Sequence, residues 1–214
     1  MEKTQTHEKR AFSFEIRAEK NEKYGAYITG MPIVYNSKTN MGYYDEIIQS
    51  GALDGANLRD VRFLVNHDTS MIPLARSRNN NENSTMQMIV DGSGMSIRVN
   101  LDVENNPTAA ELYSAVERRD IDGMSFMFDI DGEEWSDMET DHPTRTITKI
   151  ANVYEVSAAT FPAYEDTEIN VRAKATLDNA RLALENARNN APDGAENDDN
   201  LINLEHEKLK LLTM

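Results

Sequence analysis

The sequence predicts a mostly β fold with a few helices, of the α+β class, followed by a helical C-terminal tail. Short runs of alternating or β-branched residues recur between clusters of turn residues, which is typical of a barrel or a sandwich. One segment among them, residues 106–119, has the spacing of a helix. After Val171 the chain becomes rich in Ala, Leu, Glu, Arg and Asn, and this change predicts a domain of residues 1–172 and a tail of residues 173–214.

Strands are expected where apolar residues alternate or cluster. In chain order, the expected strands are Phe12–Ile16, Tyr24–Tyr35, Val61–Asn66, Met86–Val90, Met95–Val103, Met124–Ile130 and Thr146–Thr160. The turn residues Asp91-Gly92-Ser93-Gly94 tolerate positive φ, so a hairpin is expected there. Asn36–Asn40 is expected to be a turn, Tyr44–Leu53 a short helix or a loop, and Asp131-Gly132 a turn that ends its strand.

The helix of the domain and those of the tail differ in composition. In residues 106–119, Pro107 suits the first turn, and Leu112 and Val116 share one face. The tail is expected to consist of a helix at residues 173–190, an Asn- and Asp-rich linker at residues 189–200 and a second amphipathic helix at residues 201–212. We expect this tail to be partly disordered, because isolated helices of this length are marginal in water.

Charge and composition exclude several classes of partner and site. The 214-residue chain has a formal net charge of -15 and scattered basic residues, so neither nucleic acid nor an anionic membrane is an expected partner. It has no cysteine, which excludes disulfides, thiolate metal sites and a cysteine nucleophile. Residues 1–10 lack the apolar core of a signal peptide, and no apolar run approaches the roughly 20 residues of a membrane span.

The four histidines do not form a metal-binding pattern. They are His7, His67, His142 and His206, and none has the short spacing of zinc ligands. Neither a metal nor a cofactor is therefore expected. His67 is of a different kind, because it follows the apolar run Val61–Asn66. If the strand geometry continued, His67 would share a face with Val65 at the edge of the core. The alternative is a histidine that only binds a backbone carbonyl at the end of a strand.

Ser125 and Glu155 complete the side chains that could carry chemistry. Met124 and Phe126 are expected to enter the core, so Ser125 faces the other side of its strand, either in a substrate groove or simply in solvent. Glu155 lies in a run that is apolar or small on both faces and is therefore expected to be buried. A buried carboxylate needs a partner, which could be a histidine or a structural arginine.

Together these residue types supply a nucleophile, a base and a group that orients the base. A serine hydroxyl becomes a good nucleophile when a histidine takes its proton, and a carboxylate fixes the tautomer of that histidine. The chain order His67, Ser125, Glu155 is no objection, because the same constellation occurs in different orders on unrelated folds.

Several stretches resemble the prohead (capsid maturation) proteases of tailed phages. They are Phe14-Glu15-Ile16-Arg17, Gly30-Met31-Pro32-Ile33-Val34-Tyr35-Asn36, Asp45-Glu46-Ile47 through Gly51-Ala52-Leu53, Val65-Asn66-His67-Asp68, Asp122-Gly123-Met124-Ser125-Phe126-Met127-Phe128, Tyr154-Glu155-Val156-Ser157 and Thr160-Phe161-Pro162-Ala163-Tyr164. The resemblance implies that His67, Ser125 and Glu155 are catalytic. Arg76 matches a Leu-Gly-Arg-like stretch of relatives, although Ala75 replaces the glycine.

The resemblance also implies a fold, a substrate and a location. The fold is expected to be a β-barrel surrounded by helices, similar to the herpesvirus assemblins. The enzyme is expected to cut the scaffold region of the major capsid protein and itself, as a homo-oligomer inside the immature capsid in the host bacterial cytoplasm. The tail resembles an encapsidation or self-cleaved segment. The alternatives are a non-enzymatic scaffold or chaperone module on the same fold, and a hydrolase of small molecules with a closed pocket.

Overall fold

The computed structural model describes residues 7–12, 16–160 and 167–189. Residues up to 174 form one compact unit and residues from 175 onward belong to a second. In chain order the elements are β1 (Glu8–Phe12), β2 (Arg17–Asn21), β3 (Gly25–Val34), β4 (Lys38–Asn40), β5 (Asp45–Ile48), β6 (Asp60–Val65), β7 (Ala75–Arg78), β8 (Met86–Asp91), β9 (Gly94–Asn100), α1 (Pro107–Glu117), β10 (Gly123–Ser136), β11 (Thr144–Ala159) and α2 (Thr167–Asn189).

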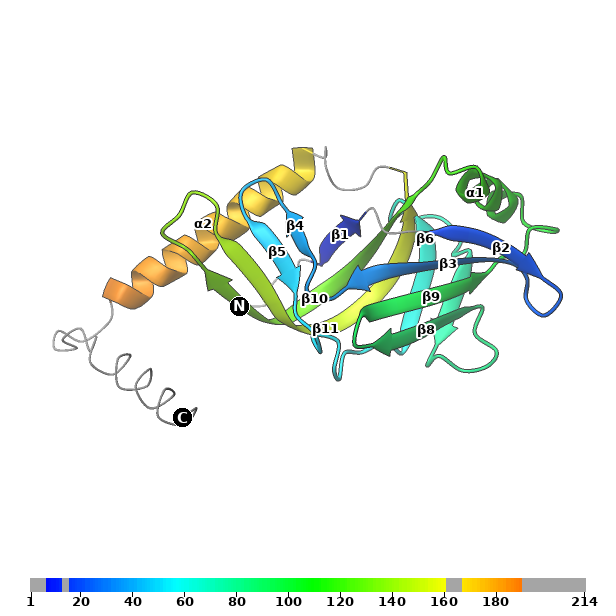
Figure 1. Cartoon of the computed structure of the whole chain (residues 1–214), viewed down its shortest axis with the longest axis horizontal. Coiled ribbons are helices and arrows are strands. Elements are labelled where there is room, and N and C mark those ends of the chain that lie inside the picture. Colours follow the sequence, from blue (N-terminus) through cyan, green and yellow to red (C-terminus); the bar gives the residue numbers. More distant parts are fainter. Residues whose placement is uncertain (1–6, 13–15, 161–166, 190–214) are drawn as a thin grey trace, which may run out of the picture. The chain divides into compact units, whose positions relative to one another are not determined.

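The first sheet is built on the long hairpin of β10 and β11 (Figure 1). β1 pairs antiparallel with the outer edge of β10. β11 is long enough to take two partners in succession: residues 144–147 pair with β5 and residues 155–158 pair with β6, both in parallel. β4 extends the sheet beyond β5, and β7 extends it beyond β6. The strands β2, β3, β9 and β8 form a second, antiparallel sheet in that order.

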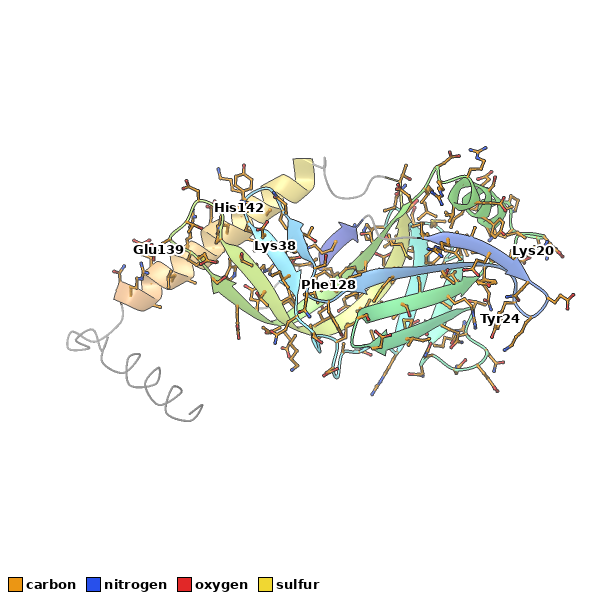
Figure 2. All side chains as sticks on the ribbon, in the orientation of Figure 1. Lys20, Tyr24, Lys38, Phe128, Glu139 and His142 are labelled. Atoms are coloured by element: carbon orange, nitrogen blue, oxygen red, sulfur yellow. The ribbon has the colours of Figure 1, made fainter. Side chains whose placement is uncertain are left out.

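The two sheets enclose one hydrophobic core. Strands of both sheets contribute side chains that are no more than 2% exposed, including Ile28 and Met95 from the second sheet and Phe63 and Phe128 from the first. Phe128 is labelled in Figure 2, where β10 crosses the molecule. Helix α1 adds Leu112 and neighbouring apolar residues to the same core and contacts β2 and β3. Burial of these apolar side chains is the main force that holds the sheets together.

The mostly β fold with helices is confirmed, but the expected closed barrel is not. Hydrogen-bonded pairing within the described residues gives two open sheets, because the first sheet branches at β11 toward β5 and β6 and does not continue into the second. Contacts between the sheets are made through the core, and β10 contacts β3 while β7 contacts β8.

Local expectations were met where the sequence pattern was strong. The hairpin around Asp91-Gly92-Ser93-Gly94 forms between β8 and β9. Helix α1 begins as predicted, with the Asn106 side chain accepting hydrogen bonds from the backbone of Thr108 and Ala109 and with Pro107 in the first turn. The tail helix was predicted at residues 173–190, and α2 extends it at its N-terminal end to Thr167.

Three local expectations were wrong. Asp131-Gly132 does not end its strand, because β10 continues through a bulge to Ser136. A Cβ on Gly132 would lie 2.8 Å from the Thr148 hydroxyl, so glycine permits this close approach. Residues 44–53 are neither a helix nor only a loop, since they contain β5. The expected turn at residues 36–40 includes the short strand β4.

Some predictions fall on residues that the structure does not describe, and others predict that a membrane span or a metal site is absent. Most of the expected strand at residues 12–16, the linker at 189–200 and the helix at 201–212 belong to the parts that the structure does not describe. The described helices include none that is both long enough and apolar enough to cross a bilayer. Over the same described residues, there is no group of three or more His, Asp or Glu side chains that could hold a metal ion.

Candidate active site

Ser125 lies in the first part of β10, between β1 and β11. Its register partners are Ala11 on β1 and Ser157 on β11. Its side chain is on the face of the strand opposite Met124, as predicted, but the residue is only 1% exposed. Ser125 is therefore not exposed to solvent or to an open groove, and β1 is paired with the edge of β10 beside it. The Ser125 hydroxyl donates a hydrogen bond to the backbone oxygen of Arg10 at 2.7 Å.

His67 follows β6 in a tight turn and does not continue the strand. Asn66 and His67 both have positive φ, at 52° and 58°, so the alternation that the sequence analysis extended to His67 ends at Val65. The Asn66 side chain fixes the turn, since it accepts from Thr160 N–H and donates to the Thr160 hydroxyl, both at 2.9 Å. This turn directs the ring of His67 toward β10 and β11.

Glu155 is on β11 and is 3% exposed. The sequence left histidine and arginine open as its partner, and the structure gives histidine. Nδ1 of His67 forms a hydrogen bond with Oε1 of Glu155, and Nε2 of the same ring forms one with the Ser125 hydroxyl. In the sequence, His67 is 58 positions from Ser125 and 88 positions from Glu155. The structure nevertheless links the three predicted side chains in one continuous set of hydrogen bonds.

Ser157 is a fourth member that the sequence analysis quoted in a motif but did not assign. Its hydroxyl donates to Oε2 of Glu155 at 2.5 Å and accepts from the backbone N–H of His67 at 3.0 Å. Ser157 therefore fixes both the carboxylate of Glu155 and the turn that contains His67. The sequence feature that could have identified Ser157 is its two-residue spacing from Glu155, which puts both side chains on one face of a strand.

Two other candidates are engaged elsewhere. Asp68, the residue next to His67, accepts from the backbone N–H and the hydroxyl of Ser70, and these bonds lower its carboxyl pKa. Arg76 on β7 forms a two-fold ion pair with Asp60, with N–O distances of 2.5 and 2.7 Å. This pairing lowers the pKa of Asp60, first through the Arg76 hydrogen bond.

A second buried polar cluster lies on the other face of β1. Arg10 contacts Glu8 and Glu46, and Arg145 contacts Glu8, Glu46 and Glu133. Burial alone would raise the pKa of Glu8, but the charges and hydrogen bonds of the two arginines hold it at about 2. The same carboxylates outweigh burial at Arg10 and raise its pKa further, so its guanidinium stays charged.

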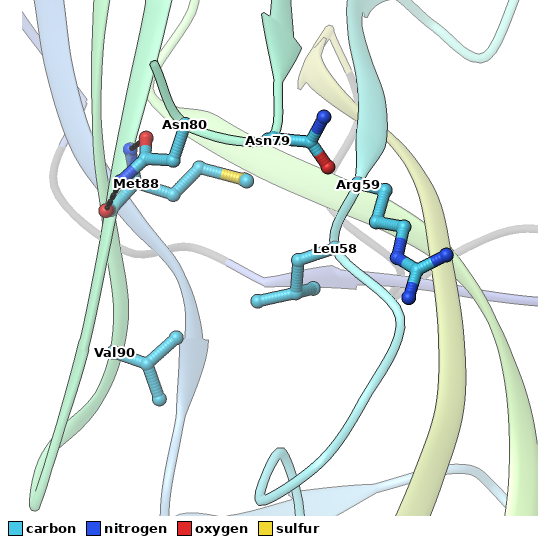
Figure 3. Close-up of a pocket in the computed structure, with 6 residues that line it drawn as sticks. All are labelled: Leu58, Arg59, Asn79, Asn80, Met88 and Val90. Carbon is cyan, nitrogen blue, oxygen red and sulfur yellow. Dashed lines mark hydrogen bonds between the residues drawn. The ribbon is translucent and has the colours of Figure 1, made fainter. Parts of the chain in front are cut away.

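A pocket of about 400 Å³ lies elsewhere, between the loop before β6 and the strand β8 (Figure 3). It is lined by Leu58, Arg59, Asn79, Asn80, Met88 and Val90. Figure 3 shows Asn80 bonded to the backbone of Met88, at 2.7 and 2.8 Å, so its amide stiffens the rim. The pocket lining includes none of the three predicted site residues, which does not favour a small-molecule hydrolase built around it.

Comparison with known proteins gives a family match over most of the chain. A family model described as caudovirus prohead serine protease matches residues 12–181. Among solved structures, the capsid assembly protease gp21 of bacteriophage T4 is similar at 14% identity with a TM-score of 0.39, covering 72% of this chain and 99% of that one. No curated protein sequence matches.

Proposed function

The chain belongs to the caudovirus prohead serine protease family and is a capsid maturation protease, and from this premise we propose that Ser125, His67 and Glu155 are its catalytic residues. One observation carries the proposal. The His67 ring contacts the Ser125 hydroxyl through Nε2 and the Glu155 carboxylate through Nδ1. These are the contacts that a nucleophile, its base and the group that orients the base require.

Each residue then has a defined step. With Nδ1–H donated to Glu155, the Nε2 of His67 is free to accept the proton of Ser125 as its oxygen attacks the substrate carbonyl carbon. The imidazolium returns that proton to the leaving amine, and water then hydrolyses the acyl-enzyme by the same route. Glu155 stabilises the imidazolium, and Ser157 holds Glu155 in place through its 2.5 Å hydrogen bond.

The proposed substrates are capsid proteins. We propose that the enzyme cuts the scaffold region of the major capsid protein, and itself, inside the immature capsid in the host cytoplasm. The net charge of -15 supports a protein substrate rather than nucleic acid. The homo-oligomer, the relationship to the herpesvirus assemblins and the role of residues 173–214 as an encapsidation or self-cleaved segment stay predictions.

The runner-up is a non-enzymatic assembly module on the same fold. In such a module nothing would require a buried serine, histidine and glutamate to be linked in one hydrogen-bonded chain, so the contacts of His67 favour the enzyme.

Incubation of the purified chain with the major capsid protein of its own phage, followed by mapping of the new termini by mass spectrometry, tests the function. Defined cuts in the scaffold region support the endopeptidase. An intact capsid protein would favour the assembly module, and intact protein with turnover of small esters would favour a small-molecule hydrolase.

A further inference from the structure

Strand β1 is paired directly beside the nucleophile of the proposed triad. It lies at the edge of the first sheet beside β10, with Ala11 opposite Ser125 (Figure 1). Ser125 is 1% exposed, and no peptide can pair with this edge of β10 while β1 is paired there. An endopeptidase has to bring a peptide bond to this oxygen, so β1 occupies the space that a substrate strand has to enter.

The backbone of β1 also competes for the proton that the reaction uses. The Ser125 hydroxyl has one proton, and both the backbone oxygen of Arg10 and Nε2 of His67 lie within hydrogen-bonding distance of it. When the proton is donated to Arg10 at 2.7 Å, it is not available to His67. The backbone carbonyl of Arg10 is therefore the group that a scissile carbonyl would replace.

The side chain of Arg10 shows what kind of residue this position accepts. Its Nε and Nη2 contact both oxygens of Glu46, the latter at 2.7 Å, and Glu46 on β5 is 2% exposed. Without β1, which contributes Arg10 and Glu8 to this cluster, the buried Glu46 would have to share Arg145 with the exposed Glu133. Glu46 would then lose the two contacts with Arg10 and keep only the one with Arg145, which is costly for a buried carboxylate unless an incoming guanidinium or ammonium group replaces Arg10.

The family match adds an independent observation. It begins at residue 12, so Glu8 to Ala11 lie outside the region that this chain shares with the family. Most of β1 thus lies outside the matched region, which contains all three residues of the triad.

We propose that the edge of β10 beside Ser125 binds extended peptide substrates, with a pocket at Glu46 that selects arginine or lysine, and that β1 fills this site in the free chain. The selected residue is the one whose carbonyl faces Ser125. The binding mode is the addition of a strand to a sheet edge, where the backbone supplies affinity and side-chain pockets supply specificity. The inference rests on the proposed function, because it takes Ser125 as the nucleophile.

The rate at which a fluorophosphonate probe labels Ser125 measures how often β1 is displaced from the edge of β10. The full-length wild type is compared with Arg10→Ala and with Lys9→Ala, and the adduct is located by mass spectrometry. Lys9→Ala is the control, because it also removes a positive charge from β1 but lies opposite Met127. Removing the buried partner of Glu46 should accelerate labelling more than about tenfold, whereas Lys9→Ala should label like the wild type.

Peptide competition tests the pocket in the unmodified chain and does not depend on the folding of Arg10→Ala. The probe peptide has the sequence of residues 7–12, His-Glu-Lys-Arg-Ala-Phe, and its partner has Gln in place of Arg. The arginine peptide should slow the labelling of wild-type Ser125 at least about tenfold more effectively than the glutamine peptide. Glu46→Gln should remove this difference.

The outcomes separate the inference from the function. Equal labelling of wild type and a folded Arg10→Ala, or equal competition by the two peptides, overturns the inference while Ser125 remains a reactive nucleophile. Complete absence of label on Ser125, together with an uncut capsid protein, refutes the proposed function and the inference with it.

Discussion

Ser157→Ala should weaken both the fold and the catalysis, because one hydroxyl holds two parts of the site. The substitution removes a hydrogen bond to the Glu155 carboxylate at 2.5 Å and one from His67 N–H at 3.0 Å. A bond to a charged group contributes about 1.5–3 kcal/mol and a neutral one about 0.5–1.5 kcal/mol, so the free energy of unfolding should fall by about 2–4 kcal/mol. For a domain of this size the melting temperature should fall by about 5–15 °C.

Turnover should fall as well, while substrate binding is spared. Glu155 would keep its contact with His67 but lose the group that fixes its second oxygen, and a misplaced base lowers kcat by about 10–100-fold. KM should be unchanged, since the Ser157 hydroxyl is engaged by Glu155 and His67 and lies on β11, on the side of β10 away from the proposed substrate edge.

Ser77→Ala is the matched control. Ser77 is also a fully buried strand serine, but its hydroxyl has no hydrogen-bond partner. Its removal should leave the melting temperature unchanged or slightly raised, with normal kcat. The two melting curves and the two kcat values check the reasoning. A Ser157→Ala protein that melts and turns over like the wild type would refute it.

Three further predictions concern the orienting carboxylate, the β1 strand and the tail. Glu155→Gln should lose most but not all of kcat, because it keeps the size but favours the wrong tautomer of His67, whereas Asp68→Asn should stay active; the reverse pattern would transfer the role to Asp68. The pKa of Glu8 is about 2, below its ordinary value of 4.5. The contribution of the Glu8 carboxylate to the stability of the fold is therefore complete above pH 4.5 and is lost as the pH falls toward 2. Denaturant unfolding of wild type and Glu8→Gln should therefore differ at neutral pH and converge at the acid end; a constant difference would contradict this. Truncation after residue 172 should leave peptide cleavage intact but reduce incorporation into proheads, with self-cleavage between about residues 172 and 200; an unfolded truncated protein, or a mature enzyme that keeps Met214, would oppose the tail's proposed role.

The strands β3, β6, β8, β9, β10 and β11 and the helix α1 could be predicted because their sequence patterns are local. The alternation around Ile97 and Phe126 and the spacing of Leu112 and Val116 indicate which side of the chain faces the core, and these patterns need no knowledge of distant contacts. β5 escaped prediction because four residues between turns give too short a pattern, and the bulge at Gly132 was mistaken for a turn because glycine serves both.

The candidate site depended on a different kind of information. Residue types suggested His67, Ser125 and Glu155, but their meeting depends on the pairing of β6, β10 and β11, which periodicity does not specify. The resemblance to a family selected them. The positive φ of His67 was unforeseen, because it is set by the contacts of Asn66 with Thr160 across the sheet. β1 was not predicted because its residues are mostly charged.

The central claim is that Ser125 and His67 act as one catalytic unit, and a double-mutant comparison tests it most directly. The measured quantity is kcat/KM for a peptide containing the capsid-protein cleavage site, with wild type, Ser125→Ala, His67→Ala and the double variant, each shown to be folded by its melting curve. Because residues that act as a unit are not additive, each single variant should lose several orders of magnitude and the double variant should be no worse than either. Retained cleavage by a folded Ser125→Ala protein, or losses that multiply in the double variant, would contradict the account.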